Sequence, residues 1–344
     1  MTDPAAAASA DAGLPAPPRA AGPEEIPVID VAPLASGDSE GTAAVAAAIG
    51  RACRGTGFFY IRGHGVPDTM MAEAFAASRA LFALPDTEKD ALSITRSPHN
   101  RGYVALAGES LDPAIPADRK EAFNIGLDLA LDDPEVVAGA PFRGVNVWPD
   151  LPGWRATMLD YFERVRALGH RLHRAIALDL GLEAGFFEPR IGRPMATLRL
   201  LHYPAEPPAA DGAIGAGVHT DYGNVTILAT DGAPGLEVRT RSGEWVAAPH
   251  VPGCFVCNIG DLLMRWSNDE YVSTPHRVVN RTGVERYSIA FFFDPDPDAR
   301  IECLETCRGP DRPARYPPTT GADYLAERLD ATYAFRRNGD AGPS

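Results

Sequence analysis

A histidine and an aspartate two residues apart, His219 and Asp221, are the residues of this sequence best suited to hold a metal ion. Side chains two positions apart on a strand point to the same side, so an imidazole and a carboxylate can face one ion here. A third ligand is available later in the chain, where His276 can return on a neighbouring strand. Two histidines and one carboxylate leave coordination positions open, as in the non-haem Fe(II) sites that activate oxygen.

The segment 286–293 reads as an apolar strand that begins with a cation. Alternation places Arg286, Ser288, Ala290 and Phe292 on one face. An arginine is costly to bury alone, so we expect it to meet a carboxylate. A guanidinium beside a hydroxyl suits the distal carboxylate of a dicarboxylic acid. An ion pair with an Asp or Glu of the protein is the alternative interpretation.

The composition limits the classes of function. The chain has 344 residues, a formal net charge of −14 and 45% hydrophobic residues, which allows one large or two modest domains. The 33 glycines and 32 prolines favour strands and loops over a helical bundle. Excess negative charge disfavours nucleic acid as a partner. We see no signal peptide and no apolar run of membrane-spanning length, so we expect no membrane association and a cytoplasmic location.

The five cysteines predict no disulfide framework, because their number is odd and their spacing uneven. Cys254 and Cys257 have the Cys-x-x-Cys spacing, but they stand in an apolar run that reads as a buried strand. Free cysteine behaves as a small hydrophobic residue, so we predict core packing in preference to a redox or zinc pair.

The remaining pattern predicts how these residues are positioned. Apolar residues three to four positions apart predict one long amphipathic helix over 154–180, and short β-like runs separated by turns fill 197–293. We predict four segments: a disordered leader (1–25), an α/β region that packs on the core (26–150), the long helix with the metal-binding core (151–310) and a C-terminal extension (311–344).

Several of these segments together resemble a known family. His219-Thr-Asp221, His276 and Arg286-x-Ser288 are similar to the iron and 2-oxoglutarate signature of the isopenicillin N synthase-like family of Fe(II)/2-oxoglutarate dioxygenases. Shorter motifs between about Ile26 and Asp294 are also similar to those of this family. The resemblance implies a mainly β fold with flanking helices: a double-stranded β-helix (jelly roll, cupin-like) core braced by the long α-helix.

The resemblance also implies roles for individual residues. His219, Asp221 and His276 would bind Fe(II), and Arg286 and Ser288 would hold the 5-carboxylate of 2-oxoglutarate. Tyr203 would assist at that carboxylate. Many plant members have asparagine where this chain has Leu201, so one polar contact to the cosubstrate is not expected. We expect the substrate to meet Phe292, Arg199, Arg101, Tyr103 and Glu109, although a solvated or structurally paired role stays open for the two arginines.

The function that follows is oxidation of a small molecule, with O2 and 2-oxoglutarate as cosubstrates, ascorbate as a candidate reductant, and succinate and CO2 as products. Hydroxylation is the default outcome, desaturation and cyclisation are alternatives, and specialised metabolism is the expected setting. Three other classes stay open: a 2-oxoglutarate-independent iron oxidase of the same family, a catalytically silent cupin-like sensor and, more weakly, a zinc hydrolase. We expect a monomer or weak homo-oligomer.

Overall fold

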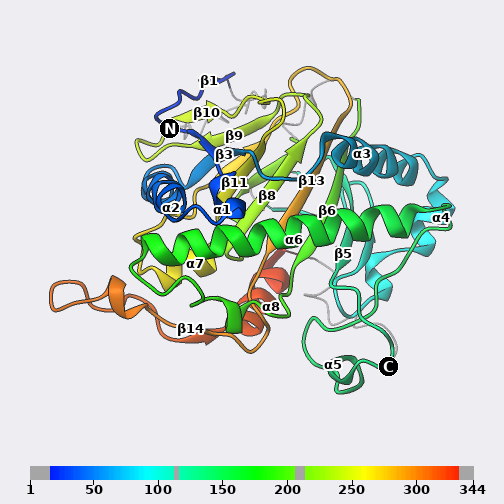
Figure 1. Ribbon diagram of the computed structural model, residues 1–344. Coiled ribbons are helices and arrows are strands. Elements are labelled where there is room, and N and C mark those ends of the chain that lie inside the picture. The colour runs from blue at the N-terminus through cyan, green and yellow to red at the C-terminus, as the bar shows by residue number, and fades with distance from the viewer. Residues whose placement is uncertain (1–15, 112–115, 206–213, 333–344) are drawn as a thin grey trace, which may run out of the picture.

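Two β-sheets form the centre of the molecule, and a long helix lies across one of them (Figure 1). The computed structural model describes residues 16–111, 116–205 and 214–332. Within these residues the larger sheet has the strand order β2-β3-β11-β8-β13-β6-β5-β4, and the smaller has the order β1-β10-β9-β12-β7. This is the jelly-roll core with flanking helices that the sequence predicted.

The strands of the larger sheet are β2 (Val28–Asp30), β3 (Phe58–Arg62), β4 (Gly102–Val104), β5 (Glu121–Gly126), β6 (Thr197–Tyr203), β8 (Val225–Thr230), β11 (Phe255–Ile259) and β13 (Arg286–Phe293). Those of the smaller sheet are β1 (Arg19–Ala20), β7 (Ala216–His219), β9 (Leu236–Arg239), β10 (Trp245–Ala247) and β12 (His276–Val278), and a separate pair consists of β14 (Arg300–Ile301) and β15 (Thr319–Thr320). The α-helices are α1 (Pro33–Ser36), α2 (Ser39–Arg54), α3 (Asp68–Phe82), α4 (Asp86–Ala91), α5 (Pro134–Val137), α6 (Trp154–Asp179), α7 (Asp261–Trp266) and α8 (Gly321–Thr332).

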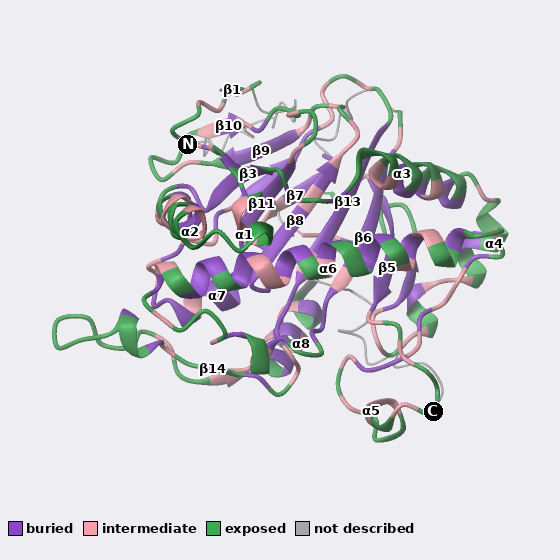
Figure 2. Ribbon diagram, viewed as in Figure 1, coloured by how far each residue is buried: buried purple, intermediate pink, exposed green. Residues whose placement is uncertain are grey.

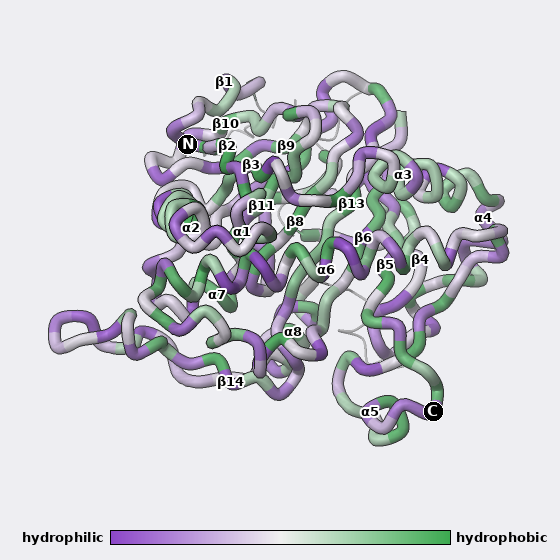
Figure 3. Tube along the Cα trace, in the orientation of Figure 1, coloured by the Kyte–Doolittle hydropathy of each residue, from purple (hydrophilic) through white to green (hydrophobic). Residues whose placement is uncertain are grey.

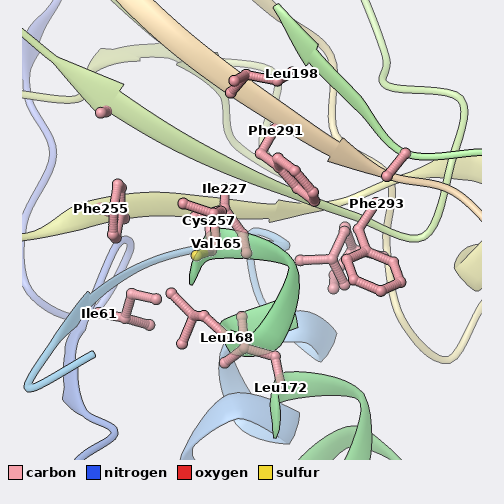
Figure 4. Packing of buried hydrophobic residues seen from close by; sticks show 14 of the residues in the cluster. Ile61, Val165, Leu168, Leu172, Leu198, Ile227, Phe255, Cys257, Phe291 and Phe293 are labelled. Atoms are coloured by element: carbon pink, nitrogen blue, oxygen red, sulfur yellow. The ribbon is translucent and has the colours of Figure 1, made fainter. Parts of the chain in front are cut away.

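Helix α6 braces the outer face of the larger sheet. Its buried residues Val165, Leu168 and Leu172 face Phe291 and Phe293 of β13 (Figure 4). Each fully buried side chain of this size contributes about 1.5–3 kcal/mol relative to an exposed one. The helix ends one residue before the end of the range that its apolar spacing predicted, and it covers the sheet that contains β13.

Strand β13 separates the core from the cavity by simple alternation. Tyr287, Ile289, Phe291 and Phe293 face the hydrophobic core beneath α6, whereas Arg286, Ser288, Ala290 and Phe292 line the cavity between the sheets. Strand β6 runs antiparallel beside β13, so that Arg286 lies opposite Tyr203 and Ser288 opposite Leu201. The predicted assignment of faces is confirmed.

Burial and hydropathy follow the same layering. The central strands are almost wholly buried, while α6 and α3 carry exposed residues on their outer sides (Figure 2). Hydrophobic residues gather on the central strands, and hydrophilic ones are more frequent in the peripheral loops (Figure 3). In the described ranges no helix has both the length and the apolar character that a membrane span requires.

The N-terminal end of the described chain differs from expectation. The predicted disordered leader extends to residue 25, but Arg19–Ala20 already pairs in parallel with β10, and Arg19 forms ion pairs with Glu25 and Glu244. The leader prediction is wrong for this stretch, because charged partners compensate for its lack of aromatic anchors; residues 1–15 lie outside the described residues. The C-terminal extension contains α8, whose Leu325 and Leu329 pack beside the cavity.

The cysteine prediction is confirmed for the pair with Cys-x-x-Cys spacing. Cys257 is fully buried on β11 and packs in the core, and Cys254 is half-buried just before that strand. All five cysteines are free thiols.

Candidate metal and cosubstrate site

The three predicted metal ligands lie together at one end of the smaller sheet. His219 ends β7 and His276 begins β12, and the antiparallel register of these strands places the two residues opposite each other. Asp221 follows two residues after β7. Its Oδ1 atom lies 3.9 Å from Nε2 of His219 and 3.7 Å from Nε2 of His276. One ligand atom from each residue lies within 4.8 Å of the other two, so one cation can contact all three.

Backbone carbonyls orient both imidazoles. Nδ1 of His219 lies 2.8 Å from the carbonyl oxygen of Gly217, and Nδ1 of His276 lies 3.0 Å from that of Thr274. Each Nδ1–H therefore donates a hydrogen bond to its carbonyl oxygen, which leaves the lone pair of Nε2 directed at the space between the three ligands. Burial, together with the neighbouring His276, lowers the pKa of His219 to about 3. The His219 imidazole is thus neutral at physiological pH, as a metal ligand must be.

The carboxylate of Asp221 is held by its other oxygen. Oδ2 accepts hydrogen bonds from Oγ1 of Thr226 at 2.5 Å and from Nδ2 of Asn258 at 2.6 Å. Burial acts to raise the pKa of Asp221, but His276, His219 and these two hydrogen bonds outweigh it and lower the pKa below its usual value. The group is therefore ionised, and Oδ1 is left to face the two imidazoles.

Arg286 is a buried cation that lines the same cavity as the three ligands. Only 1% of the residue is exposed, and its guanidinium lies 4.8 Å from the ring centroid of Tyr203. Nη1 donates to Oγ of Ser288 at 3.3 Å, while Nε has no hydrogen-bond acceptor. Across the described ranges no Asp or Glu forms an ion pair with it, so the alternative of a structural pair is not observed. A buried guanidinium in this state calls for an external carboxylate.

One cavity connects the metal ligands to Arg286 and continues toward α8. Its volume is about 1120 Å³, measured out to its open mouth. Leu201 lines the cavity opposite Ser288, and Leu228 and Val278 line it as well. Leu325 and Leu329 of α8 line it beside Tyr222. Arg286 and Phe292 stand near opposite ends of β13, so the cavity has room for a dicarboxylic acid and a second small molecule.

The predicted substrate-facing residues divide into two groups. Phe292, Arg199 and Glu109 line the cavity. Nη2 of Arg199 lies 2.7 Å from Oε2 of Glu109, so the arginine is paired as well as cavity-facing. Arg101 and Tyr103 are not among the lining residues, which corrects the expectation that they meet the substrate.

The reason for each exclusion is local. Tyr103 lies opposite Phe123 on the core side of the sheet, where its hydroxyl donates to Oε2 of Glu121 at 2.5 Å. Arg101 is buried, and its guanidinium donates to the carbonyl oxygens of His99 at 3.0 Å and Phe142 at 3.4 Å.

The structure also brings residues to the cavity that the sequence analysis did not single out: Asn124, Asp294, Leu325 and Leu329. Asp294 continues the alternation of β13 beyond Phe292, so that periodicity extended by one step would have found it. The two leucines carried no such signal, because the place of α8 depends on packing between segments distant in sequence.

A jelly roll with two histidines and an aspartate around one point, and a buried arginine across the same cavity, defines the non-haem Fe(II) oxygenase class. Comparison with known proteins agrees. The family described as non-haem dioxygenase in morphine synthesis N-terminal matches residues 26–151, and the 2OG-Fe(II) oxygenase superfamily matches residues 194–295.

Three relatives illustrate the similarity. A 2-oxoglutarate-Fe(II) type oxidoreductase of Emericella nidulans is 36% identical over 318 residues, which is 90% of this chain and 91% of the relative. A homoarginine-6-hydroxylase of Glycine max is 37% identical and covers 82% of this chain and 88% of its own. The crystal structure of a full-length Neurospora crassa protein in complex with alpha-KG and thymine superimposes with a TM-score of 0.78 at 33% identity, covering 89% of this chain and 96% of that one.

The chain belongs to the 2OG-Fe(II) oxygenase superfamily, and it is a 2-oxoglutarate-dependent Fe(II) dioxygenase. Its cofactor is Fe(II) and its cosubstrate 2-oxoglutarate. The alternatives of a 2-oxoglutarate-independent oxidase and a catalytically silent sensor are not favoured.

Proposed function

We propose that His219, Asp221 and His276 hold the Fe(II) of this dioxygenase and that Arg286, Ser288 and Tyr203 hold the 5-carboxylate of 2-oxoglutarate. The observation that carries the proposal is the pairing of a preformed ligand set with a buried, ion-pair-free guanidinium in one cavity. When bound, Fe(II) would supply the chemistry by which O2 oxidises both 2-oxoglutarate, to succinate and CO2, and the substrate.

The protein's own residues prepare this chemistry. The carbonyls of Gly217 and Thr274 keep the two imidazoles in the tautomer that binds a metal. Thr226 and Asn258 donate to Oδ2 of Asp221, so Oδ1 is the oxygen that would be free to bind the metal. Apolar walls around the cosubstrate end exclude water, which strengthens the attraction between Arg286 and a carboxylate.

The substrate is a small organic molecule that binds in the half of the cavity bordered by Phe292, Arg199 and α8. The Glycine max relative is named for hydroxylation of homoarginine, and the Neurospora crassa structure contains thymine. Both names support a small-molecule substrate and hydroxylation as the default outcome. The predicted cytoplasmic location, the specialised-metabolism setting, ascorbate as reductant and the monomeric or weakly associating state stay predictions.

An anaerobic titration with Fe(II) and 2-oxoglutarate tests the assignment of ligands. We expect the wild-type protein to develop the metal-to-ligand absorption band in the green region and His219→Ala to lose it. His250→Ala is a matched control, because His250 is exposed and lies outside this cavity. A band of full intensity in His219→Ala would refute the assignment. Hydroxylation is tested by incubating the enzyme with a panel of metabolites and measuring succinate. A hydroxylated product should be heavier than its substrate by one oxygen atom.

A further inference from the structure

Asp294 is a buried carboxylic acid that the iron and 2-oxoglutarate chemistry does not use. It follows directly after β13, only 5% of it is exposed, and it lines the same cavity as Phe292. Its Oδ1 atom has no hydrogen-bond partner, and the described ranges supply no ion pair to its carboxylate. Burial, followed by the charge of Asp221, raises the pKa of Asp294 to about 7.

Arg199 and Lys120, two cations that line the cavity, already pair with carboxylates of the protein. Arg199 lies 2.7 Å from Glu109, and Nζ of Lys120 lies 3.0 Å from the same carboxylate and contacts Asp118. In these contacts of the described residues two cations accompany two anions, and Asp294 adds a further negative charge when it is ionised. This half of the cavity therefore attracts positive charge.

A second residue that lines the cavity, Asn124, also has a buried acceptor oxygen without a hydrogen-bond donor. Oδ1 of Asn124 is buried without a hydrogen-bond donor, and Asn124 lines the cavity opposite Arg199 on β6. The orientation of its amide is set by Nδ2, which donates to the carbonyl oxygen of Asn100 at 3.3 Å. Two buried acceptor oxygens in one cavity, both without a donor, call for a ligand that supplies N–H groups.

The backbone makes room for the Asp294 carboxylate at one position. A Cβ atom on Gly223 would lie 1.5 Å from Oδ1 of Asp294. Gly223 has a backbone conformation that other residues can adopt, because its φ is not positive. The glycine is therefore required by the space that the carboxylate occupies and not by the turn itself.

We propose that Asp294 is the specificity-determining residue of this enzyme and that its substrate carries a positively charged nitrogen group, an ammonium, amidinium or guanidinium. Such a group supplies both the charge that balances the carboxylate and the N–H donors that Asp294 and Asn124 lack. An ion pair formed in a cavity shielded from water is stronger than one at the surface. The inference rests on the proposed function, since it concerns the substrate of that same site.

Matched fragment probes test the charge preference without requiring turnover. The anaerobic complex with Fe(II) and 2-oxoglutarate is titrated with butylguanidinium against butylurea and with pentylammonium against 1-pentanol, and the shift of the absorption band reports binding. We expect each cation to bind the wild-type protein about ten- to 100-fold more tightly than its neutral partner, the range of a hydrogen bond to a charged group.

Two variants assign this preference to Asp294. Asp294→Asn keeps the size of the side chain and should remove the preference, and Gly223→Ala should do the same by displacing the carboxylate. Asp298→Asn is the matched control, because Asp298 is exposed and lies outside the cavity; it should behave as wild type. In every variant the affinity for 2-oxoglutarate, read from the appearance of the band, should be unchanged, which also shows that the variant is folded.

Three results overturn the proposal: neutral probes that bind wild type as tightly as the cations, an absence of binding by either cation, or a preference that survives in Asp294→Asn. Failure of the band to form with Fe(II) and 2-oxoglutarate in wild type would instead contradict the proposed function, so the two failures are distinguishable.

Discussion

Replacing Arg286 with methionine should raise the stability of the metal-free protein and weaken its binding of 2-oxoglutarate. Arg286 is 1% exposed, its Nε has no acceptor, and within residues 16–111, 116–205 and 214–332 no carboxylate pairs with it. Without cosubstrate the buried charge opposes folding, so Arg286→Met should raise the free energy of unfolding of the metal-free protein by about 1–4 kcal/mol. With cosubstrate the same charge binds a carboxylate, so the substitution should weaken that binding.

The expected loss of binding follows from the burial of the charge. Removing one partner of a buried charged pair costs about 2–5 kcal/mol, which corresponds to roughly a 30- to 5000-fold increase in the Kd of 2-oxoglutarate. The assay is the anaerobic absorption titration, and urea denaturation of the metal-free protein gives the stability.

Arg277→Met provides the control, because Arg277 is also buried but does not line the cavity, and its Nη2 lies 2.8 Å from Oε2 of Glu237. It should lower stability by about 1–3 kcal/mol, the cost of a lost charged hydrogen bond, and leave the Kd unchanged. A lower stability of Arg286→Met together with an unchanged Kd would refute the reasoning.

Three further predictions concern stability and α8. Burial raises the pKa of Asp294 to about 7 in the folded chain, against an ordinary value of 3.8. As pH rises from 4 to 8, the free energy of unfolding of the metal-free protein should therefore fall by up to about 4 kcal/mol relative to that of Asp294→Asn. Parallel pH profiles of the two proteins in denaturant would contradict this. Gly169→Ala would place a Cβ atom 2.2 Å from the ring of Phe293 and should lower the free energy of unfolding by about 1–3 kcal/mol, with no loss of Tm as the contrary result. Tyr324→Phe removes a 2.9 Å hydrogen bond to Asp261, worth about 1.5 kcal/mol, and should speed amide exchange in α8 about tenfold, whereas Tyr316→Phe should not.

Which residues face the metal site could be predicted from the sequence, because side chains alternate between the two faces of a strand. Strand alternation places His219 and Asp221 on one side, and the same rule places Arg286 and Ser288 together on β13. The long helix was predictable for a similar reason, since apolar spacing alone determines which face of α6 is buried. The place of His276 depends on the register between β12 and β7, which no local pattern specifies; the sequence indicated only that this residue could return on a neighbouring strand.

The substrate half could not be predicted in the same way. Tyr103 lies on edge strand β4 and faces the core, where its hydroxyl donates to Glu121, whereas Arg101 precedes that strand and donates to backbone carbonyls. Similarly, nothing in the residues around Arg199 reveals that Glu109 pairs with it from a distant loop.

By itself the sequence determined the metal-ligand types, the cosubstrate cation and the helix that braces the sheet, since each depends on residues a few positions apart. Only the tertiary structure decided which charges remain unmatched. Arg199 pairs with Glu109, 90 residues away in the sequence, and among the described residues Oδ1 of Asp294 has no hydrogen-bond partner. Long-range packing sets such contacts, and no local pattern encodes them.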